Sequence, residues 1–285
     1  MCIRDRGVDF VGGRSYVVRF EQPVSQEKIQ SNLIKVLGNA EVKTFGSDNQ
    51  LKITTNYKVD TDSSDIDDEI NNILYTDLIE FMPENIAYED FVVNGDENKQ
   101  AGIMSSIKVG PTIADDIKKN SFYAVFGSLI IVFLYILLRF KNWQFSLGAV
   151  SAVFHDVLVV LGIFSLTYSF MPFNMEINQA FIAAVLTVIG YSLNDTVVVF
   201  DRIREYRNIN TSWELPRVVD SALNSTLSRT LNTSFTTLVV LISIFVFGGE
   251  SIRGFMFALI VGVLIGTYSS VFVATPVMYD TLKNK

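Results

Sequence analysis

Five long apolar segments, separated by short polar stretches, occupy this 285-residue chain from residue 122 onward. Each has about 17 to 25 residues, the length that an α-helix needs to cross the hydrocarbon core of a bilayer. The predicted spans are Phe122 to Leu138, Phe145 to Tyr168, Ile177 to Phe200, Ser228 to Phe247 and Phe255 to Met278. The pattern predicts a multi-pass α-helical membrane domain over residues 122–280, followed by a tail at 281–285.

The fourth segment differs from the others in its polar content. Phe235 to Phe247 is fully apolar, but Ser221 to Thr237 is rich in Ser, Thr and Asn and contains Arg229. A helix of this kind is stable in a membrane only if its polar face is turned toward other helices or water.

In residues 1–112, apolar residues recur at the spacings typical of strands and of amphipathic helices. Strands are predicted at Arg14 to Phe20, Ala40 to Phe45, Leu51 to Tyr57 and Ile103 to Val109, with a turn at Gly46 to Asn49. Helices are predicted at Gln26 to Leu37, between Ser25 as cap and Gly38, and from Ser63 or Ser64 to Leu78. The order β-α-β-β-α-β is typical of a small α+β ferredoxin-like domain, which by itself fixes no function. A connector at 113–121 would join it to the first span.

Composition agrees with a polar domain followed by a membrane domain, since the chain is 49% hydrophobic yet has a net charge of −7. The single cysteine, Cys2, rules out a disulfide framework or a thiolate metal cluster within the chain. Between Val59 and Asn98 there is no Lys or Arg, while Asp and Glu recur. Such a run is usually a solvated acidic face, and it argues against binding of nucleic acid, whose phosphates it repels.

Basic residues set the expected orientation, because cytoplasmic ends of membrane helices are rich in Lys and Arg. One set of ends carries Arg139, Lys141, Arg202, Arg204, Arg207, Arg217, Lys283 and Lys285. The opposite set carries Lys118, Lys119 and Arg253. We therefore expect a cytoplasmic C-terminus and an external N-terminal domain. Export of that domain without a signal peptide leads us to expect a sixth, upstream span, in a longer polypeptide of which this is a fragment or half.

Four ionisable residues fall at membrane depth: His155, Asp156, Asp195 and Arg229. A carboxylate such as Asp195 costs several kcal/mol there unless it is paired, hydrated or protonated. One interpretation is a polar residue that only holds helices together. The other is an ion-coupling site, which the rest of the chain favours.

Asp195 belongs to a predicted polar stripe with Thr187, Tyr191 and Asn194, spaced to share one face of the third span. Arg229, Thr233 and Thr237 form a similar stripe on the fourth. Because Asp195 and Arg229 both lie several residues inside the cytoplasmic end, we expect them to meet. A carboxyl group poised between a positive charge and exclusion from water can load and release a proton as water access changes.

The other polar and small residues have simpler alternatives. His155 and Asp156 are adjacent, so they are expected on different faces of their helix, and a packing hydrogen bond would also explain His155. Small residues repeat every four positions in the fifth span, at Gly254, Ala258, Gly262, Gly266, Ser270 and Ala274. This stripe predicts close helix packing.

Enzymatic interpretations find little support. A phosphate-binding Gly-x-x-x-x-Gly-Lys-Ser/Thr loop is absent, and a single histidine excludes a two-histidine zinc motif. An intramembrane aspartyl protease using Asp156 and Asp195 is the best alternative, but their sequence contexts differ from that family and Arg229 would disturb a shared proton. We predict a protein that is not an enzyme and needs no cofactor or metal.

Several motifs resemble those of the SecF family, the smaller partner in the bacterial SecD–SecF protein-export pair of the resistance-nodulation-division superfamily. They are Gly7 to Gly13 (GVDFVGG), Val109 to Pro111 (VGP), His155–Asp156, Ser192 to Glu205 (SLNDTVVVFDRIRE), Ser228 to Thr230 (SRT) and Phe247 to Gly249 (FGG). In that family the glycine motif follows a first membrane helix, so the resemblance implies a truncated chain or the second half of a SecD–SecF fusion.

The resemblance implies a protein of the bacterial inner membrane that uses a proton or sodium gradient to assist protein export. The implied partners are a SecD-like membrane protein, a SecYEG-type channel, exported unfolded polypeptides and membrane lipid. Asp195 and Arg229 match the family's coupling carboxylate and its basic partner. A small-molecule or lipid permease of the same superfamily and a passive assembly scaffold remain as alternatives.

Overall fold

The computed structural model describes residues 7–61, 64–83, 86–93, 99–168, 170–171, 173 and 175–283. The predictions that concern Cys2, Ser63 and Lys285 lie outside these residues. The chain forms two compact units. The first comprises Met1–Asn120, Tyr168–Gln179 and Gly249–Gly254, and the second comprises Ser121–Thr167, Ala180–Gly248 and Phe255–Lys285.

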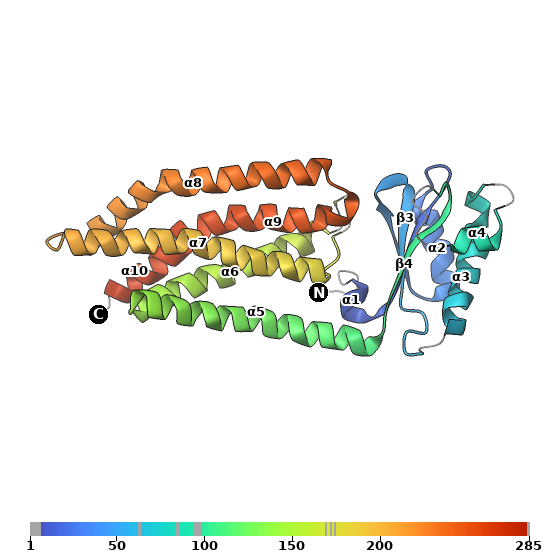
Figure 1. The fold of residues 1–285 in the computed structure, drawn as a ribbon, viewed down its shortest axis with the longest axis horizontal. Coiled ribbons are helices and arrows are strands. Elements are labelled where there is room, and N and C mark those ends of the chain that lie inside the picture. The colour runs from blue at the N-terminus through green and yellow to red at the C-terminus, as the bar shows by residue number, and fades with distance from the viewer. Residues whose placement is uncertain are drawn as a thin grey trace. The chain divides into compact units, whose positions relative to one another are not determined.

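The N-terminal α/β domain in the first unit has the predicted ferredoxin-like topology. Its elements are α1 (Val8–Val11), β1 (Gly13–Arg19), α2 (Gln26–Leu37), β2 (Ala40–Phe45), β3 (Ser47–Thr55), α3 (Ser64–Leu78), η2 (Ile79–Phe81), α4 (Tyr88–Val92) and β4 (Gly102–Val109). The strands form one antiparallel sheet in the order β2-β3-β1-β4 (Figure 1). A long connection between β1 and β2, with β3 inserted between them, is what the order β-α-β-β-α-β requires.

Two local predictions need correction. The turn predicted at Gly46 to Asn49 is wrong, because β3 already begins at Ser47 and pairs with Phe45. Gly46 alone reverses the chain, with a φ of 84° that glycine adopts without a steric penalty. Ser25 occupies the position before α2 but makes no capping hydrogen bond with its side chain. Gly38 ends that helix as predicted, with a φ of 70°.

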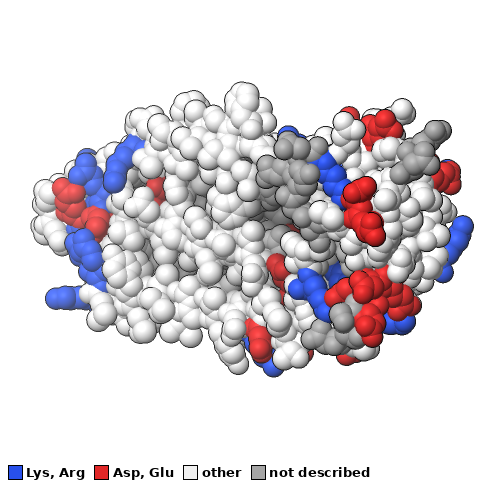
Figure 2. Space-filling model, turned by 45° about the vertical axis from the view of Figure 1, so that its right-hand side comes forward, with Lys and Arg blue, Asp and Glu red and all other residues white. Residues whose placement is uncertain are grey.

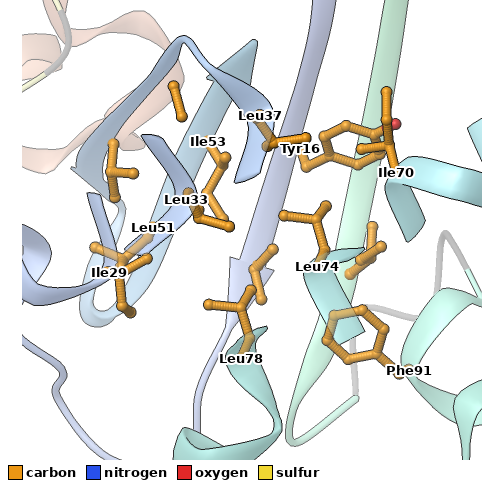
Figure 3. Close-up of a cluster of buried hydrophobic side chains, with 14 of the residues drawn as sticks. Tyr16, Ile29, Leu33, Leu37, Leu51, Ile53, Ile70, Leu74, Leu78 and Phe91 are labelled. Carbon is orange, nitrogen blue, oxygen red and sulfur yellow. The ribbon is translucent and has the colours of Figure 1, made fainter. Parts of the chain in front are cut away.

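The core of the domain lies between the sheet and helices α2 and α3. Side chains at helical spacing point from both helices toward the sheet (Figure 3): Ile29, Leu33 and Leu37 from α2, and Ile70, Leu74 and Leu78 from α3. They pack against alternate residues of the strands, including Tyr16, Leu51 and Ile53. Since successive strand residues point to opposite faces, the residues between them belong to the second face of the sheet.

The described residues contain five helices long and apolar enough to cross a membrane, which agrees with the five predicted spans. The elements are α5 (Pro111–Phe140), α6 (Trp143–Thr167), α7 (Gln179–Ile209), α8 (Leu215–Phe247), and a last span built from α9 (Glu250–Ser269), the π-helical turn η3 (Ser270–Ala274) and α10 (Thr275–Lys283). Helix α5 begins at Pro111, so the chain is already helical over the predicted connector at 113–121.

Within this chain the five spans are packed to different degrees. In their most apolar windows, 44% of the residues of α6, of α7 and of the last span are buried, against 17% for α8 and 6% for α5. Where α5, α6 and α7 meet, the rings of Phe140 and Phe145 stack, and the ring of Phe200 packs edge-on against both. Close by, Asp201 forms ion pairs with Arg139 and Arg204. Figure 2 shows basic and acidic side chains gathered at this end of the helices, while the visible face along them carries few charges.

Candidate functional site

Asp156 of α6 is a fully buried carboxylate surrounded by hydrogen-bond partners. Its Oδ2 accepts hydrogen bonds from the hydroxyls of Ser192 of α7 (2.6 Å) and Ser269 of α9 (2.8 Å). Its Oδ1 lies 3.1 Å from Nδ1 of His155. The two neighbours differ in exposure as predicted, with side chains 34% and 1% exposed, yet they contact each other. Asp156 therefore joins three helices through groups that satisfy its lone pairs.

The small-residue stripe of the last span allows these helices to approach. A Cβ added at Gly266 would lie 2.9 Å from Cβ of Ser192, and one at Gly262 would lie 2.0 Å from a methyl carbon of Val188. One turn further, the hydroxyl oxygens of Thr196 and Ser270 are 2.9 Å apart and share a hydrogen bond. The prediction that this stripe serves close packing is confirmed, and the same approach brings Ser270 to α7 and Ser269 to Asp156 of α6.

Asp195 of α7 is also buried, with 3% exposure, but its surroundings are much poorer in hydrogen bonds. One oxygen, Oδ2, lies 3.5 Å from the hydroxyl of Ser234 of α8. That hydroxyl is engaged more closely with Thr267 of α9, at 2.6 Å. A carboxylate with a single long hydrogen bond retains free lone pairs for a proton, a cation or water.

A cavity of about 580 Å³ lies beside this hydroxyl pair, between α8 and the last span. Its walls are mostly apolar, from Leu231, Phe235, Leu264 and other large side chains. Thr230, Ser234 and Thr267 supply hydroxyls to the same cavity. The hydroxyl that touches Asp195 is thus also part of a cavity wall.

Arg229 was expected to meet Asp195, but the two side chains are not in contact. In the described part of the chain, its side chain is exposed and makes no ion-pair contact with Asp195. The buried polar stripe of α8 consists of Thr226, Thr230 and Ser234, one position away from the predicted stripe of Arg229, Thr233 and Thr237. Thr237 does reach α7, where its hydroxyl accepts from Tyr191 at 3.3 Å.

The predicted stripe on α7 is also divided by the packing. Asp195 is buried, whereas Asn194 and Thr187 are exposed. Among the predicted site residues, the structure brings His155 into contact with Asp156, and Asp195 near the charge of Arg229; Asn194 joins neither group. The hydroxyl partners Ser192, Ser234, Thr267 and Ser269 were missed, although hydroxyl residues four apart within apolar spans were a usable signal.

The arrangement does not favour an aspartyl protease. The hydrogen bonds of Asp156 go to Ser192 and Ser269, and that of Asp195 goes to Ser234. No hydrogen bond joins the two carboxylates within the described residues, as a shared catalytic proton would require. In the same residues, no three His, Cys, Asp or Glu side chains are grouped so as to hold a metal ion.

Five helices of membrane-spanning length, joined to a ferredoxin-like domain and holding buried carboxylates, define a multi-pass membrane protein. The family model "Protein export membrane protein SecD/SecF, C-terminal" matches residues 91–284, and the "SecD/SecF GG Motif" matches residues 6–24. This chain belongs to the SecF family of protein translocase subunits.

Similar proteins agree with that assignment. The protein translocase subunit SecF of Rhodothermus marinus is 44% identical over 275 residues, 96% of this chain and 82% of that protein. The subunit SecDF of Brucella abortus is 45% identical over 170 residues, 60% of this chain and 22% of that protein. A crystal structure of SecDF in a "Super-membrane-facing form" matches with a TM-score of 0.63 and 28% identity, covering 98% of this chain and 35% of that one.

Proposed function

We propose that the chain acts as the SecF-type subunit of a bacterial Sec translocase and uses a proton or sodium gradient to assist late steps of protein export. The observation that carries the proposal is the contrast between the two buried carboxylates. Asp156 has short hydrogen bonds from two hydroxyls, whereas Asp195 has, among the described residues, a single hydrogen bond at 3.5 Å. Asp195 is therefore the group with capacity to take up and release an ion.

The positive charge of Arg229 and the cavity beside Ser234 support this role. A positive charge on the neighbouring helix favours an ionised carboxylate, while burial disfavours any charge. The energy available is adequate, since one elementary charge crossing 100 mV releases about 2.3 kcal/mol. Asp156, His155 and Asn194 would support the coupling site rather than carry the ion.

A SecD-like membrane protein is the proposed partner. In the described residues of α8, Ser228, Arg229, Asn232 and Thr236 are exposed together with large apolar side chains. Apolar side chains can face lipid, but an arginine at membrane depth needs polar neighbours or water to solvate its charge. The SecDF relatives contain a large additional part, since this chain covers 22% and 35% of them. We propose that a corresponding chain or domain covers this face of α8.

Location and remaining partners follow from the family and the charge distribution. We propose the bacterial inner membrane, with the N-terminal domain outside and the C-terminus in the cytoplasm. A SecYEG-type channel and exported unfolded polypeptides would be the other partners, and the role would be non-enzymatic. The relatives named above are translocase subunits, so a small-molecule or lipid permease is not favoured.

The test is preprotein translocation into membrane vesicles with and without an imposed ion gradient. Asp195→Asn keeps the size and polarity of the side chain but removes its capacity to bind and release a proton. We expect this variant to insert and to associate with its SecD-like partner. Gradient-driven stimulation should fall about tenfold or more, because the chain loses the carboxylate that would carry the ion.

Asp201→Asn is the matched control, because Asp201 lies on the same helix in ion pairs with Arg139 and Arg204. It should retain most of the stimulation, since partly exposed ion pairs contribute little. If Asp195→Asn shows the same gradient dependence as wild type, Asp195 serves only in packing. The chain would then be better explained as a passive scaffold.

A further inference from the structure

The segment that joins α6 to α7, Tyr168–Gln179, belongs to the same compact unit as the N-terminal sheet. We call it the α6–α7 segment; residues 169, 172 and 174 of it lie outside the described residues. Phe173 and Met175 are buried, with 7% and 1% exposure. This segment ends at Gln179, the first residue of α7, which carries Asp195 sixteen residues further on.

The second face of the sheet presents two lysines that directly oppose each other. Lys43 of β2 pairs with Lys52 of β3 in the antiparallel register. Both alternate with Val42, Leu51 and Ile53, which point into the core on the other face. Like charges at directly opposite positions destabilise a sheet. Glu41 of β2 can neutralise Lys43 on this face, so Lys52 calls for a second negative charge.

The α6–α7 segment supplies that charge. Oε2 of Glu176 lies 2.6 Å from Nζ of Lys52, and the two side chains are 5% and 14% exposed. The other lysine is neutralised by Glu41 at 3.2 Å, and its Nζ lies 3.4 Å from the ring centre of Tyr168. The Tyr168 hydroxyl donates to Glu41 in turn. Burial lowers the pKa of Lys43, and the nearby Glu41 and Glu176 carboxylates oppose that effect.

Residues of the glycine motif, Gly7 to Gly13, form hydrogen bonds with the C-terminal end of the same segment. The backbone N–H of Gly7 donates to the carbonyl of Ile177 at 3.0 Å. Oδ2 of Asp9 accepts from the backbone N–H of Gln179 at 3.0 Å. A helix begins with N–H groups that lack partners in the helix, and a carboxylate there satisfies one of them. Asp9 thus caps α7 from a different part of the chain.

Gly7 packs tightly against this segment. A Cβ at that position would lie 3.3 Å from Oε2 of Glu176 and 3.3 Å from Cβ of Asn178. The glycine therefore permits the backbone contact with Ile177 beside the ion pair. Capping by Asp9, the Gly7 contact and the Glu176–Lys52 pair all fall within four residues of the segment, Glu176 to Gln179.

We propose that Lys52 and Asp9 are positioning residues that fix the outer end of α7 to the N-terminal sheet, so that displacement of this helix is transmitted to the domain. The inference rests on the proposed function, because it assumes that α7 moves when Asp195 gains or loses an ion. From Gln179 to Asp195 the helix spans about 24 Å at a rise of 1.5 Å per residue. A continuous helix over that distance transmits displacement along its axis.

A purely stabilising role is the simpler explanation, and the chemistry argues against it. Buried ion pairs contribute little net stability, and well-packed apolar residues often serve as well or better. What an ion pair adds is a defined register between two elements. If displacement of α7 is to reach the domain, Glu176 must keep a fixed position relative to the sheet.

Charge reversal tests the proposal in vesicles that contain the complete translocase. Lys52→Glu and Glu176→Lys should each lower gradient-driven stimulation about tenfold, since each leaves like charges buried together. The double variant restores an ion pair of opposite polarity and should recover at least about half of the stimulation. Export without a gradient should be unchanged, whereas a general folding defect would lower both rates.

The chain offers a matched control in the exposed pair of Lys28 and Glu80. Its atoms are also 2.6 Å apart, but the side chains are 53% and 66% exposed. Reversal of either charge there should change nothing, because exposed pairs contribute little. If the buried single variants fail to insert, Asp9→Leu and Asp9→Asn provide the second test: only Asn retains an oxygen that can accept from Gln179, so only Asp9→Leu should lose stimulation.

Three outcomes would overturn the proposal: single reversals with wild-type stimulation, a double variant as poor as the singles, or Asp9→Leu equal to Asp9→Asn. The Asp195→Asn variant in the same vesicles separates this failure from failure of the proposed function. If Asp195→Asn loses stimulation while the charge reversals keep it, only the coupling is wrong. If Asp195→Asn keeps stimulation, the proposed function itself is wrong.

Discussion

At the scale of single residues, the surroundings of a buried polar group decide what it can do. Asp156 and Asp195 are the same residue type at similar burial, on neighbouring helices. Two short hydrogen bonds from hydroxyls fix the first. The second has one long contact and a nearby positive charge. Only the side chains that surround each carboxylate, contributed by other helices, make this distinction.

Tyr16 gives a prediction that can be measured by alkaline titration. Burial raises the pKa of its hydroxyl from 10.0 to about 12, with Asp67 adding to the rise and Arg14 opposing it. The unfolded chain therefore loses this proton at a lower pH than the folded domain does. The free energy of unfolding should fall as the pH rises from 10 to 12, by about 2 kcal/mol for this group.

Tyr16→Phe removes the titrating hydroxyl and should flatten that decline. The measurement is unfolding of the purified chain in detergent, followed by circular dichroism between pH 9 and about 12. If wild type and Tyr16→Phe lose stability in parallel over this range, the hydroxyl does not titrate as described. Tyr16 is 3% exposed in the core of the domain, so the comparison reports on that core.

At the scale of elements, the last span depends on glycines at particular positions. A Cβ at Gly262 would overlap the Val188 side chain of α7, whereas one at Gly162 of α6 would meet no other atom within 4 Å. Both glycines lie within long helices, and their substitution by alanine improves helix propensity equally. The difference between them therefore isolates the cost of overpacking.

Gly262→Ala should lower the free energy of unfolding by about 1–3 kcal/mol, because Val188 and the helix backbone must shift to admit a methyl group. Gly162→Ala should be neutral or slightly stabilising. Thermal unfolding of both variants in the same detergent provides the measurement. Equal midpoints for the two would show that α7 and the last span are not in close contact.

The elements themselves could be predicted because periodicity and length report directly on helices and strands. All five spans and the four strands in their ferredoxin-like order follow from such patterns. The predictions that failed depended on contacts with residues that are distant in the sequence. Residues 47–50 belong to β3 because Ser47 pairs with Phe45 of β2 and Gln50 pairs with Arg19 of β1. Ser234 instead of Arg229 meets Asp195 because of the rotation of α8. Helical spacing identifies residues that share a face, but not which face a neighbouring helix contacts.

At the scale of the whole molecule, the proposed orientation can be tested with single cysteines in a Cys2→Ser background. Asn72 of α3 and Asn208 near the end of α7 are both exposed. With the N-terminal domain outside, Asn72→Cys should react in intact cells with an impermeant maleimide. Asn208→Cys should react only after the membrane is permeabilised, because basic ends of membrane helices face the cytoplasm.

The reverse pattern would invert the orientation and with it the direction of the proposed ion flow. Equal labelling of both positions in intact cells would instead point to leaky membranes. Phe170 provides a useful third position, because it is 83% exposed in the α6–α7 segment. Its reactivity should follow that of Asn72, since both belong to the first compact unit.

The π-helical turn Ser270–Ala274 affects where a residue can be removed from the last span without disturbing its packing. Such a turn accommodates one additional residue while the helical segments before and after it keep their phase. Here the Thr275 hydroxyl donates to the carbonyl of Ser270 at 2.9 Å, and Met278 beyond it is fully buried. Loss of one residue within the turn would restore an ordinary α-helix and leave Met278 in place. The same loss between Thr275 and Met278 would rotate the remaining residues by about 100°, so we expect deletion of one residue to be tolerated within this turn but not in the helix that follows it.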